Sequence, residues 1–387
     1  MAKLSRSCPV SLIRLLRFLL IAVIFLCSVG TALCISGAVF FGSNFAETTN
    51  RASVSSAAIM DRYDMAMTNR ISTALDGLLS IEKVFWLRDE DVIAPKPNLS
   101  AFGEATDPAA LRDVLDNAEE LLNGQQTLFN EDTPIRKDST IHYYLDDTIL
   151  AIVWQEQRGE VIYTIAEVKI AHASQFRRFF AGNTYGHDKQ YHTTKMSEDV
   201  NAIMAASGDF YMYRQEGTVV YNGIVERADT RGKVDTCFID DKGDLIFSHK
   251  GELTDIDQAQ RFVDANNIRF SISFGPILIE DGLNVTPRSY ALGEIRERYP
   301  RAALCQAGDL HYCVITANCR SNKGHFPTLM EFAAFVASTG CETAYTLDGG
   351  QTATIAMNHQ HINPVQYGSQ RKISDIFYFA TAIPDGG

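Results

Sequence analysis

The sequence lacks the short motifs that identify several common enzyme classes. It has no Gly-x-Ser-x-Gly elbow, no Walker phosphate-binding loop and no Gly-x-Gly-x-x-Gly fingerprint. These absences argue against a serine-triad hydrolase, a nucleoside triphosphatase and a dehydrogenase, because each of these chemistries depends on its own specialised turn. Internal repeats and low-complexity segments are also missing.

Positive charge is scarce as well. The 387 residues include 35 Lys and Arg against 47 Asp and Glu, which gives a formal net charge of -12. An acidic chain without a basic stripe interleaved with aromatic residues has no general attraction to nucleic acid, so we expect no nucleic-acid partner. Any site for an anionic substrate must therefore be local.

None of the eight cysteines has Cys-x-x-Cys spacing, which gives a zinc site little support. The globular part contains five of them, so at least one stays unpaired within the chain. Two pairings remain open, Cys305 with Cys313 and Cys319 with Cys341. Buried free thiols are the alternative, because free cysteine packs as a small hydrophobic residue. The scattered histidines do not suggest a metal centre either.

The N-terminal part contains a long charge-free stretch, from Phe18 to Phe41. A membrane-spanning helix needs about 20 apolar residues to cross the hydrocarbon layer, and this stretch is long enough. Basic residues precede it, so the positive-inside rule predicts a cytoplasmic tail (1–17), a transmembrane anchor (18–41) and an extracellular remainder. A cleaved signal peptide is the alternative, with Ser36-Gly37-Ala38 as a cleavage site, but its apolar region is usually shorter.

Residues 42–130 are predicted to form a helical stalk or extension. Apolar residues recur at three- and four-residue intervals over 48–88, which predicts a helix. We expect this helix to pack on the domain, since a partner-binding coiled coil would need a sustained heptad repeat. After the helix-breaking tract 94–98, a short helix is predicted at 108–123, with Asp107 as N-cap and Pro108 at its first position.

The segment 131–194 begins the globular region and is rich in β-branched and aromatic residues. Stretches 141–156 and 160–171 are predicted to form a hairpin. The pattern also predicts helices at 174–180 and 197–206, and strands at 208–215, 218–227, 234–240 and 244–251. The carboxylates of the turn at 241–244 suggest calcium, but their spacing does not match a calcium loop, and we favour a plain hairpin.

The remainder of the domain 195–387 alternates irregularly between helices and strands. Helices are predicted at 254–266, with Thr254 as N-cap, and at 328–339; strands are predicted at 268–282, 301–309, 310–318, 341–350 and 373–383. This order predicts an α+β fold with mixed β-sheet layers and packed helices, preceded by the membrane anchor, rather than a doubly wound sheet.

The segment around Asp348-Gly349-Gly350 is the most informative for function. A short apolar strand leads into the aspartate, and a carboxylate at a strand end is held rigidly, as an acid–base group or nucleophile must be. Successive glycines allow a ligand to approach the peptide N–H groups, although the same sequence is common in simple turns.

Three other features are candidates. Gly275-Pro276 interrupts a strand pattern, which marks a bulge or an edge, and Asp281 follows it. Asp209 is flanked by aromatic residues that suit a sugar ring, or equally the edge of a core. Arg301 and Arg371 each precede an apolar strand, and arginine binds phosphate oxygens in bidentate fashion, although each could form a surface salt bridge.

The order of these pieces resembles the phosphodiester glycosidase family over roughly residues 195–383. The shared motifs are Gly-Asp-Phe-Tyr, Phe-Gly-Pro-x-Leu-x-x-Asp-Gly, Arg-Ala-Ala, Leu-Asp-Gly-Gly-x-Thr and a late arginine. The family includes an enzyme that removes N-acetylglucosamine from a phosphodiester and bacterial exported proteins linked to exopolysaccharide. This chain departs from the family pattern at Ser207-Gly208, where Asn-Gly is usual, and at Gln351-Thr352, where Gly-Ser is usual.

The resemblance implies a membrane-anchored extracytoplasmic glycosidase that hydrolyses a sugar-1-phosphodiester in a cell-envelope or exopolysaccharide glycan. It implies catalysis by Asp348, with Asp281 or Asp209 as second carboxylate. Substrate binding is expected from Arg301, Arg371, Gly349, Gly350, Thr352, Ser207, Gly208 and Gly275. No metal ligand is assigned, and calcium is the one cofactor left open. The alternative is a non-catalytic glycan-binding or structural protein of the same assembly.

Overall fold

The computed structural model of the chain describes residues 86–384, apart from 89–90, 187, 291–294 and 320–323. These residues belong to one of the two compact units into which the chain divides, 83–387. The predicted tail, the anchor at 18–41 and nearly all of the helix predicted at 48–88 lie outside the described residues. Within the described part of the chain, no helix is long and apolar enough to cross a bilayer.

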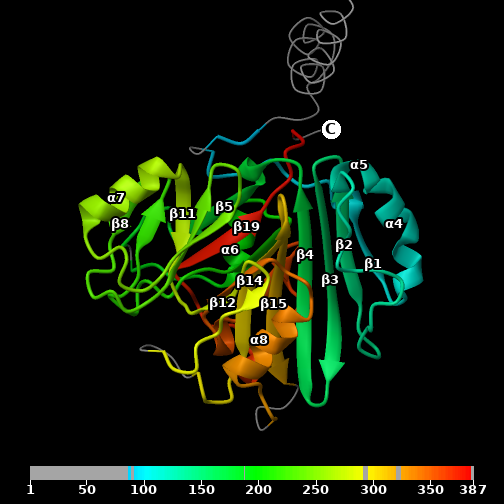
Figure 1. Cartoon of the computed structure of the whole chain (residues 1–387). Coiled ribbons are helices and arrows are strands. Elements are labelled where there is room, and N and C mark those ends of the chain that lie inside the picture. The colour runs from blue at the N-terminus through cyan, green and yellow to red at the C-terminus, as the bar shows by residue number, and fades with distance from the viewer. Residues whose placement is uncertain (1–85, 89–90, 187, 291–294, 320–323, 385–387) are drawn as a thin grey trace, which may run out of the picture. The chain divides into compact units, whose positions relative to one another are not determined.

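A nine-stranded sheet forms the centre of the molecule (Figure 1). Its β4 strand is buried throughout because both faces of the sheet are covered. From edge to edge the strands are β1 (Phe102–Ala105), β2 (Ile141–Asp146), β3 (Ile149–Arg158), β4 (Val161–Ile170), β15 (His311–Cys319), β14 (Arg301–Gly308), β16 (Thr343–Leu347), β12 (Ile277–Glu280) and β13 (Leu283–Asn284).

Two five-stranded sheets complete the β structure. The first contains, in spatial order, β10 (Leu245–Ser248), β9 (Thr236–Asp240), β11 (Ile268–Ile272), β7 (Val219–Tyr221) and β8 (Ile224–Arg227). The second contains β18 (Gln360–His361), β17 (Ile355–Met357), β6 (Met204–Ser207), β19 (Asp375–Phe379) and β5 (Phe176–Phe180).

Helices cover the outer faces of these sheets. The α-helices are α4 (Arg112–Asn117), α5 (Glu119–Leu122), α6 (Thr193–Asp199), α7 (Ile256–Ala265) and α8 (Leu329–Ala337). The 3-10 helices are η2 (Leu99–Ala101), η3 (Pro108–Leu111), η4 (Ala173–Gln175), η5 (Gly350–Thr352) and η6 (Gln366–Gly368). The N-terminus of α8 is fixed by a capping box between Thr328 and Glu331.

The main hydrophobic core lies between the nine-stranded sheet and the two smaller sheets. Phe176 of β5 is at its centre, stacked on Phe379 at 4.5 Å and in contact with Tyr312 of the large sheet at 4.8 Å. Burial of such a ring contributes roughly 2–3 kcal/mol to stability. A further core lies between the opposite face of the nine-stranded sheet and helices α4, α5 and α8, so the large sheet is packed on both sides.

The predicted α+β character is confirmed, but the predicted mixed sheets are wrong. Every strand pairing within the described residues is antiparallel, including β4 with β15 and β14 with β16. Several pairs of neighbouring strands are joined by tight turns, such as Asn222-Gly223 between β7 and β8, and short turns can join only antiparallel strands. The plain hairpin predicted around 241–244 is also confirmed, between β9 and β10.

Other predicted elements are shifted or wrong. Instead of a helix at 174–180, η4 is followed by strand β5, whose residues are all buried between neighbouring layers. The helix predicted at 197–206 is replaced by α6 and strand β6, and the strand predicted at 208–215 is a loop. The strand predicted at 141–156 is two strands, because the Asp146 carboxylate accepts hydrogen bonds from Thr148 N and Ile149 N and closes a turn.

The helices predicted at 108–123 and 254–266 are confirmed with adjusted boundaries. Asp107 caps η3, with Pro108 at its first position, and the segment continues as α4 and α5. Helix α7 is capped by Asp255 rather than Thr254, since the Asp255 side chain accepts from Asp257 N and Gln258 N.

The five cysteines of the globular part are all buried and free, so neither of the two pairings left open by the sequence forms.

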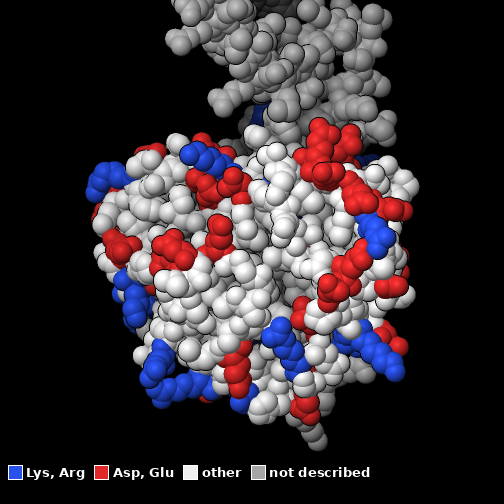
Figure 2. All heavy atoms as spheres, turned by 45° about the vertical axis from the view of Figure 1, so that its right-hand side comes forward, with Lys and Arg blue, Asp and Glu red and all other residues white. Residues whose placement is uncertain are grey.

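Charged side chains are interspersed on the visible face of the molecule. Figure 2 shows Asp and Glu over its upper and right-hand parts and most Lys and Arg toward its lower edge, without a continuous basic stripe on that face.

Candidate active site

A pocket of about 490 Å³ lies at one end of the nine-stranded sheet. Antiparallel pairing of β14 with β16, and of β16 with β12, brings the start of β14, the end of β16 and the start of β12 to the same end. The rest of its lining comes from the loop 208–217, from segments 274–276 and 295–299, from the first residue of α8 and from the segment 348–371. Segments separated by more than 150 positions in the sequence therefore meet at one place.

Asp348 follows the last residue of β16 and lines this pocket. Its Oδ1 accepts a hydrogen bond from Gly349 N at 2.8 Å, and its Oδ2 accepts one from Arg371 Nη2 at 2.9 Å. Burial raises the pKa of the Asp348 carboxyl, while the Thr352 hydroxyl and the Arg371 charge oppose part of that rise. A fixed carboxyl group with a raised pKa is suited to proton transfer.

The two glycines after Asp348 allow the chain to turn tightly against the start of β14. A Cβ atom at Gly349 would lie 2.2 Å from the Pro300 carbonyl oxygen, so only glycine fits there. Gly350 N donates to the same oxygen at 3.2 Å, and Thr352 Oγ1 donates to Gly349 O at 2.6 Å. The N–H groups predicted to bind phosphate are thus engaged in holding the turn.

The two predicted arginines both line the pocket. Arg371 pairs with Asp348, and its guanidinium packs over the rings of Phe210 and Tyr213, at 5.4 and 5.2 Å from their centroids. Arg301 is buried at the start of β14, where its Nη2 donates to Glu297 O at 2.8 Å. Their positions give the pocket two permanent positive charges beside one carboxylate.

A third arginine, Arg214, was not predicted. Its Nη2 donates to Ser273 O and Phe274 O at 2.6 and 2.7 Å, and its guanidinium lies 4.7 Å from the Phe274 ring centroid. The Nε atoms of Arg214 and Arg371 are buried and have no hydrogen-bond partner among the described residues. Buried donors of this kind call for an acceptor, and an anionic ligand would supply one.

Residues 200–380 match the family model described as phosphodiester glycosidase. This part of the chain, slightly less than half of its 387 residues, is therefore similar to the phosphodiester glycosidase family. The matched range contains every pocket residue named above.

One curated protein and two solved structures are among those similar to this chain. The SPbeta prophage-derived uncharacterized protein YomE of Bacillus subtilis (strain 168) is 29% identical over 107 residues, 28% of this chain and 17% of that protein. The chain thus spans less than a fifth of the length of the curated relative that it matches. The zebrafish N-acetylglucosamine-1-phosphodiester alpha-N-acetylglucosaminidase catalytic domain, auto-inhibited by its pro-peptide, is 15% identical, with a TM-score of 0.49 over 68% of this chain and 92% of that one. A hypothetical protein from Synechocystis is 13% identical, with a TM-score of 0.49 over 64% and 65% of the two chains.

Within the matched range, Asp209 lies behind the pocket wall and is not exposed to the pocket. Its Oδ2 accepts a hydrogen bond from Ser273 N at 2.8 Å and lies 3.6 Å from Arg178 Nη2, and the side chain has no exposed surface. Arg178 also pairs with Asp375 at 2.8 Å. Asp209 therefore belongs to a buried ion cluster that anchors the 208–217 loop.

Asp281 is not brought to the pocket. It lies in the turn after β12, whereas the pocket is at the other end of that strand, beside Pro276. The predicted binding residues Ser207 and Gly208 also lie away from the pocket surface. Ser207 is buried in β6, and a Cβ at Gly208 would lie 2.4 Å from the Asp375 carboxylate. Of the remaining predicted residues, Gly275 lines the pocket directly and Thr352 supports Asp348.

No group of three or more His, Cys, Asp or Glu side chains within the described ranges is arranged to hold a metal ion. In the turn at 241–244, the carboxylate oxygen Oδ1 of Asp240 accepts hydrogen bonds from Lys242 N and Asp244 N, which closes the hairpin. Calcium stays the one cofactor that the sequence leaves open.

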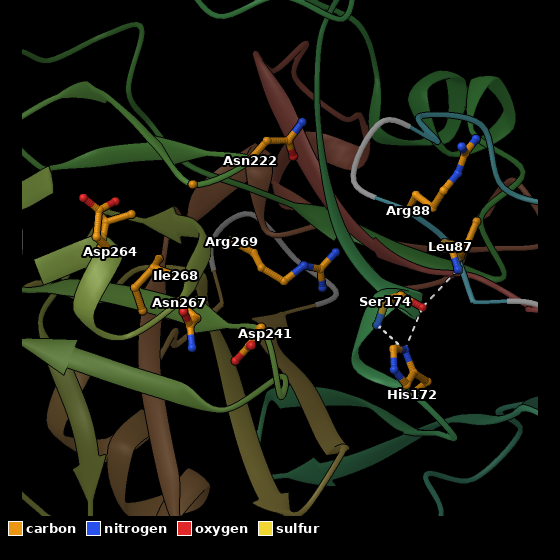
Figure 3. Close-up of a pocket in the computed structure, with 12 residues that line it drawn as sticks. Leu87, Arg88, His172, Ser174, Asn222, Asp241, Asp264, Asn267, Ile268 and Arg269 are labelled. Carbon is orange, nitrogen blue, oxygen red and sulfur yellow. Dashed lines mark hydrogen bonds between the residues drawn. The ribbon is translucent and has the colours of Figure 1, made fainter. Parts of the chain in front are cut away.

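A second pocket, of about 700 Å³, lies elsewhere in the domain, between residues 87–88, the β7–β8 turn and the end of α7 (Figure 3). Its lining includes both basic and acidic side chains, among them Arg269 and Asp241. Arg269 donates to the carbonyl oxygens of Ala173 and Phe176, at 2.8 and 3.2 Å. This pocket lacks the combination of a partly buried carboxylate and converging arginines that marks the first pocket, and we therefore favour the first as the active site.

Proposed function

We propose that this protein hydrolyses a sugar-1-phosphodiester, releasing the sugar and a phosphomonoester. The observation that carries the proposal is the arrangement of one partly buried carboxylate, Asp348, among three arginines that line the same pocket. Arg214, Arg301 and Arg371 match the charge of a phosphodiester and of the dianion that leaves it.

The reaction needs one bond to form and one to break. Water attacks the anomeric carbon, the bond from that carbon to the phosphate oxygen breaks, and its electron pair stays on the phosphomonoester. In the proposal Asp348 accepts the proton that the attacking water loses and passes it to solvent. A phosphate leaving group stabilised by arginines needs little protonation, so one carboxylate in the pocket is sufficient.

The test is hydrolysis of a panel of sugar-1-phosphodiesters by the purified protein, with and without calcium. Asp348→Asn should lower kcat by about 10²–10⁴-fold, which is the usual contribution of a positioned acid–base group. Asp281→Asn is the matched control, because this exposed turn carboxylate lies outside the pocket, and we expect its activity to equal that of the wild type. Unchanged turnover in Asp348→Asn, with an intact fold, would remove Asp348 from the mechanism.

The alternative function is glycan binding without hydrolysis. Specific binding of a sugar phosphodiester by a pure wild-type protein that releases no phosphomonoester would favour it. In that case the arginines would retain their role and Asp348 would serve only to hold Arg371.

We also propose that the domain faces the outside of the cell and is held by a helix over 18–41, with a phosphate-linked glycan of the cell envelope or an exopolysaccharide as its substrate. The charge-free stretch 18–41 and the basic residues before it support this location. Fractionation of cells that express the full chain or a chain without residues 1–41 tests it. Equal release of both proteins from membranes by salt alone would contradict the anchor.

A further inference from the structure

A buried hydroxyl group lies in the wall of the pocket. Thr346 of strand β16 is 2% exposed and lines the pocket together with Asp348. Within the described residues, its Oγ1 atom has no hydrogen-bond partner. Nearly all buried polar groups have such a partner, and one that lacks it destabilises the fold. The hydroxyl of Thr346 therefore needs an explanation.

The strand itself does not need a hydroxyl at this position. Thr346 N donates to Pro276 O at 3.1 Å, and the residue pairs with Ala303 of β14, so its backbone is held from both sides. Valine has the same branched shape and suits a buried strand equally well. Valine would also avoid the cost of an unpaired polar atom. The reason for a threonine here must lie outside the packing of the strand.

The side chain of Thr346 lies on the face of the nine-stranded sheet that α8 covers. Its neighbours Tyr345 and Leu347 both belong to the main core on the other face, and successive side chains of a strand alternate between faces. Leu329, the first residue of α8, lines the same pocket. The pocket therefore extends from Asp348, just after the strand, to Thr346 on this face.

The position of Thr346 distinguishes it from other threonines of the sheet. Three further hydroxyls there are buried without a partner among the described residues, those of Thr164, Thr316 and Thr343, but none of these residues lines the pocket. The Thr352 hydroxyl, close to Asp348, is committed to Gly349 O. Thr346 thus combines an available hydroxyl with a place in the pocket.

An attacking water needs different partners from those of a phosphate group. Phosphate oxygens only accept hydrogen bonds, and they suit the Nε donors of Arg214 and Arg371, which have no partner among the described residues. A water whose lone pair faces the anomeric carbon has two protons to donate, so it needs two acceptors. Asp348 supplies one acceptor, and a threonine hydroxyl, unlike an arginine, can supply the other.

We propose that Thr346 is a positioning residue that holds the attacking water together with Asp348. The proposal rests on the proposed function, because it assumes attack by water on the anomeric carbon. Two residues of extended chain span about 6.6 Å, and a water bridging two oxygens joins atoms about 5.5 Å apart. The water donates one proton to Asp348 as its bond to carbon forms and one hydrogen bond to Thr346 Oγ1. Thr346 keeps its own proton throughout.

Hydrolysis and thermal unfolding of the full-chain variants test the proposal. Thr346→Val should lower kcat by about 10–100-fold and change KM by less than about 2-fold, because a hydrogen bond to the attacking water is lost and substrate binding is not. Thr346→Ser restores the hydroxyl and should have a kcat within about 3-fold of wild type. Without ligand, Thr346→Val should have a Tm equal to or above wild type, and inorganic phosphate should raise both Tm values equally.

The matched control is Thr164→Val. Thr164 has the same kind of unpaired, fully buried hydroxyl, but it lies in β4, three strands from β16 in the sheet. This variant should keep the wild-type kcat and KM.

Hydrolysis in aqueous methanol gives a signal that a structural role would not change. Methanol has one proton to donate, so it cannot satisfy Asp348 and Thr346 together. In wild type, the ratio of methyl glycoside to free sugar should be about 10-fold below the molar ratio of methanol to water, as loss of one hydrogen bond implies. Thr346→Val should raise the product ratio about 10-fold, and Thr164→Val should leave it unchanged.

The outcomes separate this proposal from the proposed function. Absence of hydrolysis by wild type, across the panel of sugar-1-phosphodiesters, would refute the proposed function and the role of Thr346 with it. In an active enzyme, a wild-type kcat or a wild-type product ratio in Thr346→Val would overturn the role of Thr346 alone. A lower Tm in unliganded Thr346→Val would assign the hydroxyl to the fold. Loss of the Tm gain with inorganic phosphate in that variant would assign it to the phosphate, and either result would overturn the proposal.

Discussion

The buried ion cluster behind the pocket is the feature whose disruption should have the largest effect on the fold. Arg178 has no exposed side-chain surface, its Nε donates to Asp375 Oδ2 at 2.8 Å, and its Nη1 donates to Ser271 O. Asp209, which begins the loop that carries Arg214, is the second carboxylate of the cluster. We predict that Arg178→Met destabilises the protein and displaces that loop.

The magnitude follows from the charges that remain. Removing one partner of a buried ion cluster costs about 3–5 kcal/mol, because the other charges stay buried without compensation. Unfolding entropy is about 2.1 cal/mol/K per residue, so for the 83–387 unit the Tm should fall by about 5–8 °C. Activity should fall as well, because Phe210 and Arg214 lie in the same loop as Asp209 and line the pocket.

The loss should depend on pH. Burial raises the pKa of Asp375 to about 6 from an ordinary 3.8, while the Arg178 charge opposes that rise. The folded state therefore binds this proton more strongly than the unfolded state, and the associated stability, about 3 kcal/mol, is present below pH 4 and is lost as pH rises through about 6. Removal of Arg178 raises the pKa of Asp375 further, so Arg178→Met should lose more stability at pH 8 than at pH 5.

The assay is thermal or urea unfolding at pH 5 and pH 8. Arg112→Met, which removes an exposed pair with Glu131, is the matched control and should unfold like wild type at both pH values. The double variant Arg178→Met/Asp375→Asn should recover part of the stability at pH 8, because it removes one of the uncompensated charges. An equal loss at pH 5 and pH 8 would mean that Arg178 acts through packing, and the electrostatic reasoning would be refuted.

Two further predictions concern the pocket and the thiols. Arg214→Met should lower kcat/KM by roughly 100-fold and abolish the Tm gain with inorganic phosphate, because one charged donor to the developing anion is lost. The control is Arg231→Met, which removes an exposed arginine paired with Glu216 and should change neither quantity. Unchanged kcat/KM and Tm gain in Arg214→Met would exclude Arg214 from the site. Five thiols of the globular part should resist alkylation in the native protein and react after unfolding, because all five are buried: Cys237, Cys305, Cys313, Cys319 and Cys341. The labelled peptides are identified by mass spectrometry, and rapid labelling of the native protein would contradict the packing.

The sequence was informative where a local pattern is sufficient to form a structure. The turn at 241–244 closes the predicted hairpin, Thr328 caps the predicted helix α8, and the Asp348-Gly349-Gly350 turn follows a buried strand as expected. Arg301 and Arg371 share the pocket with Asp348, as the motif order implied. These features depend on turn chemistry, capping and strand ends, which neighbouring residues decide.

The errors arose where contacts distant in sequence override local preference. Residues 174–180 have no alternating pattern, yet 176–180 become a strand because β19 pairs along them and other layers cover both faces. Asp281 and Asp348 each follow an apolar strand, but β12 and β16 are antiparallel, so the two strands end at opposite ends of the sheet. A sequence read without sheet register cannot separate these cases.

The sequence by itself thus determined the α+β composition and the family-like motifs. It also determined three pocket residues, Asp348, Arg301 and Arg371. Each of these features is encoded within a few neighbouring residues. Only the tertiary structure decided that Asp209 is committed to Arg178, that Arg214 joins the pocket and that Tyr367 is exposed beside it. The reason is that antiparallel register and sheet packing bring together side chains from distant segments, and no periodicity in the sequence reports which segments will meet.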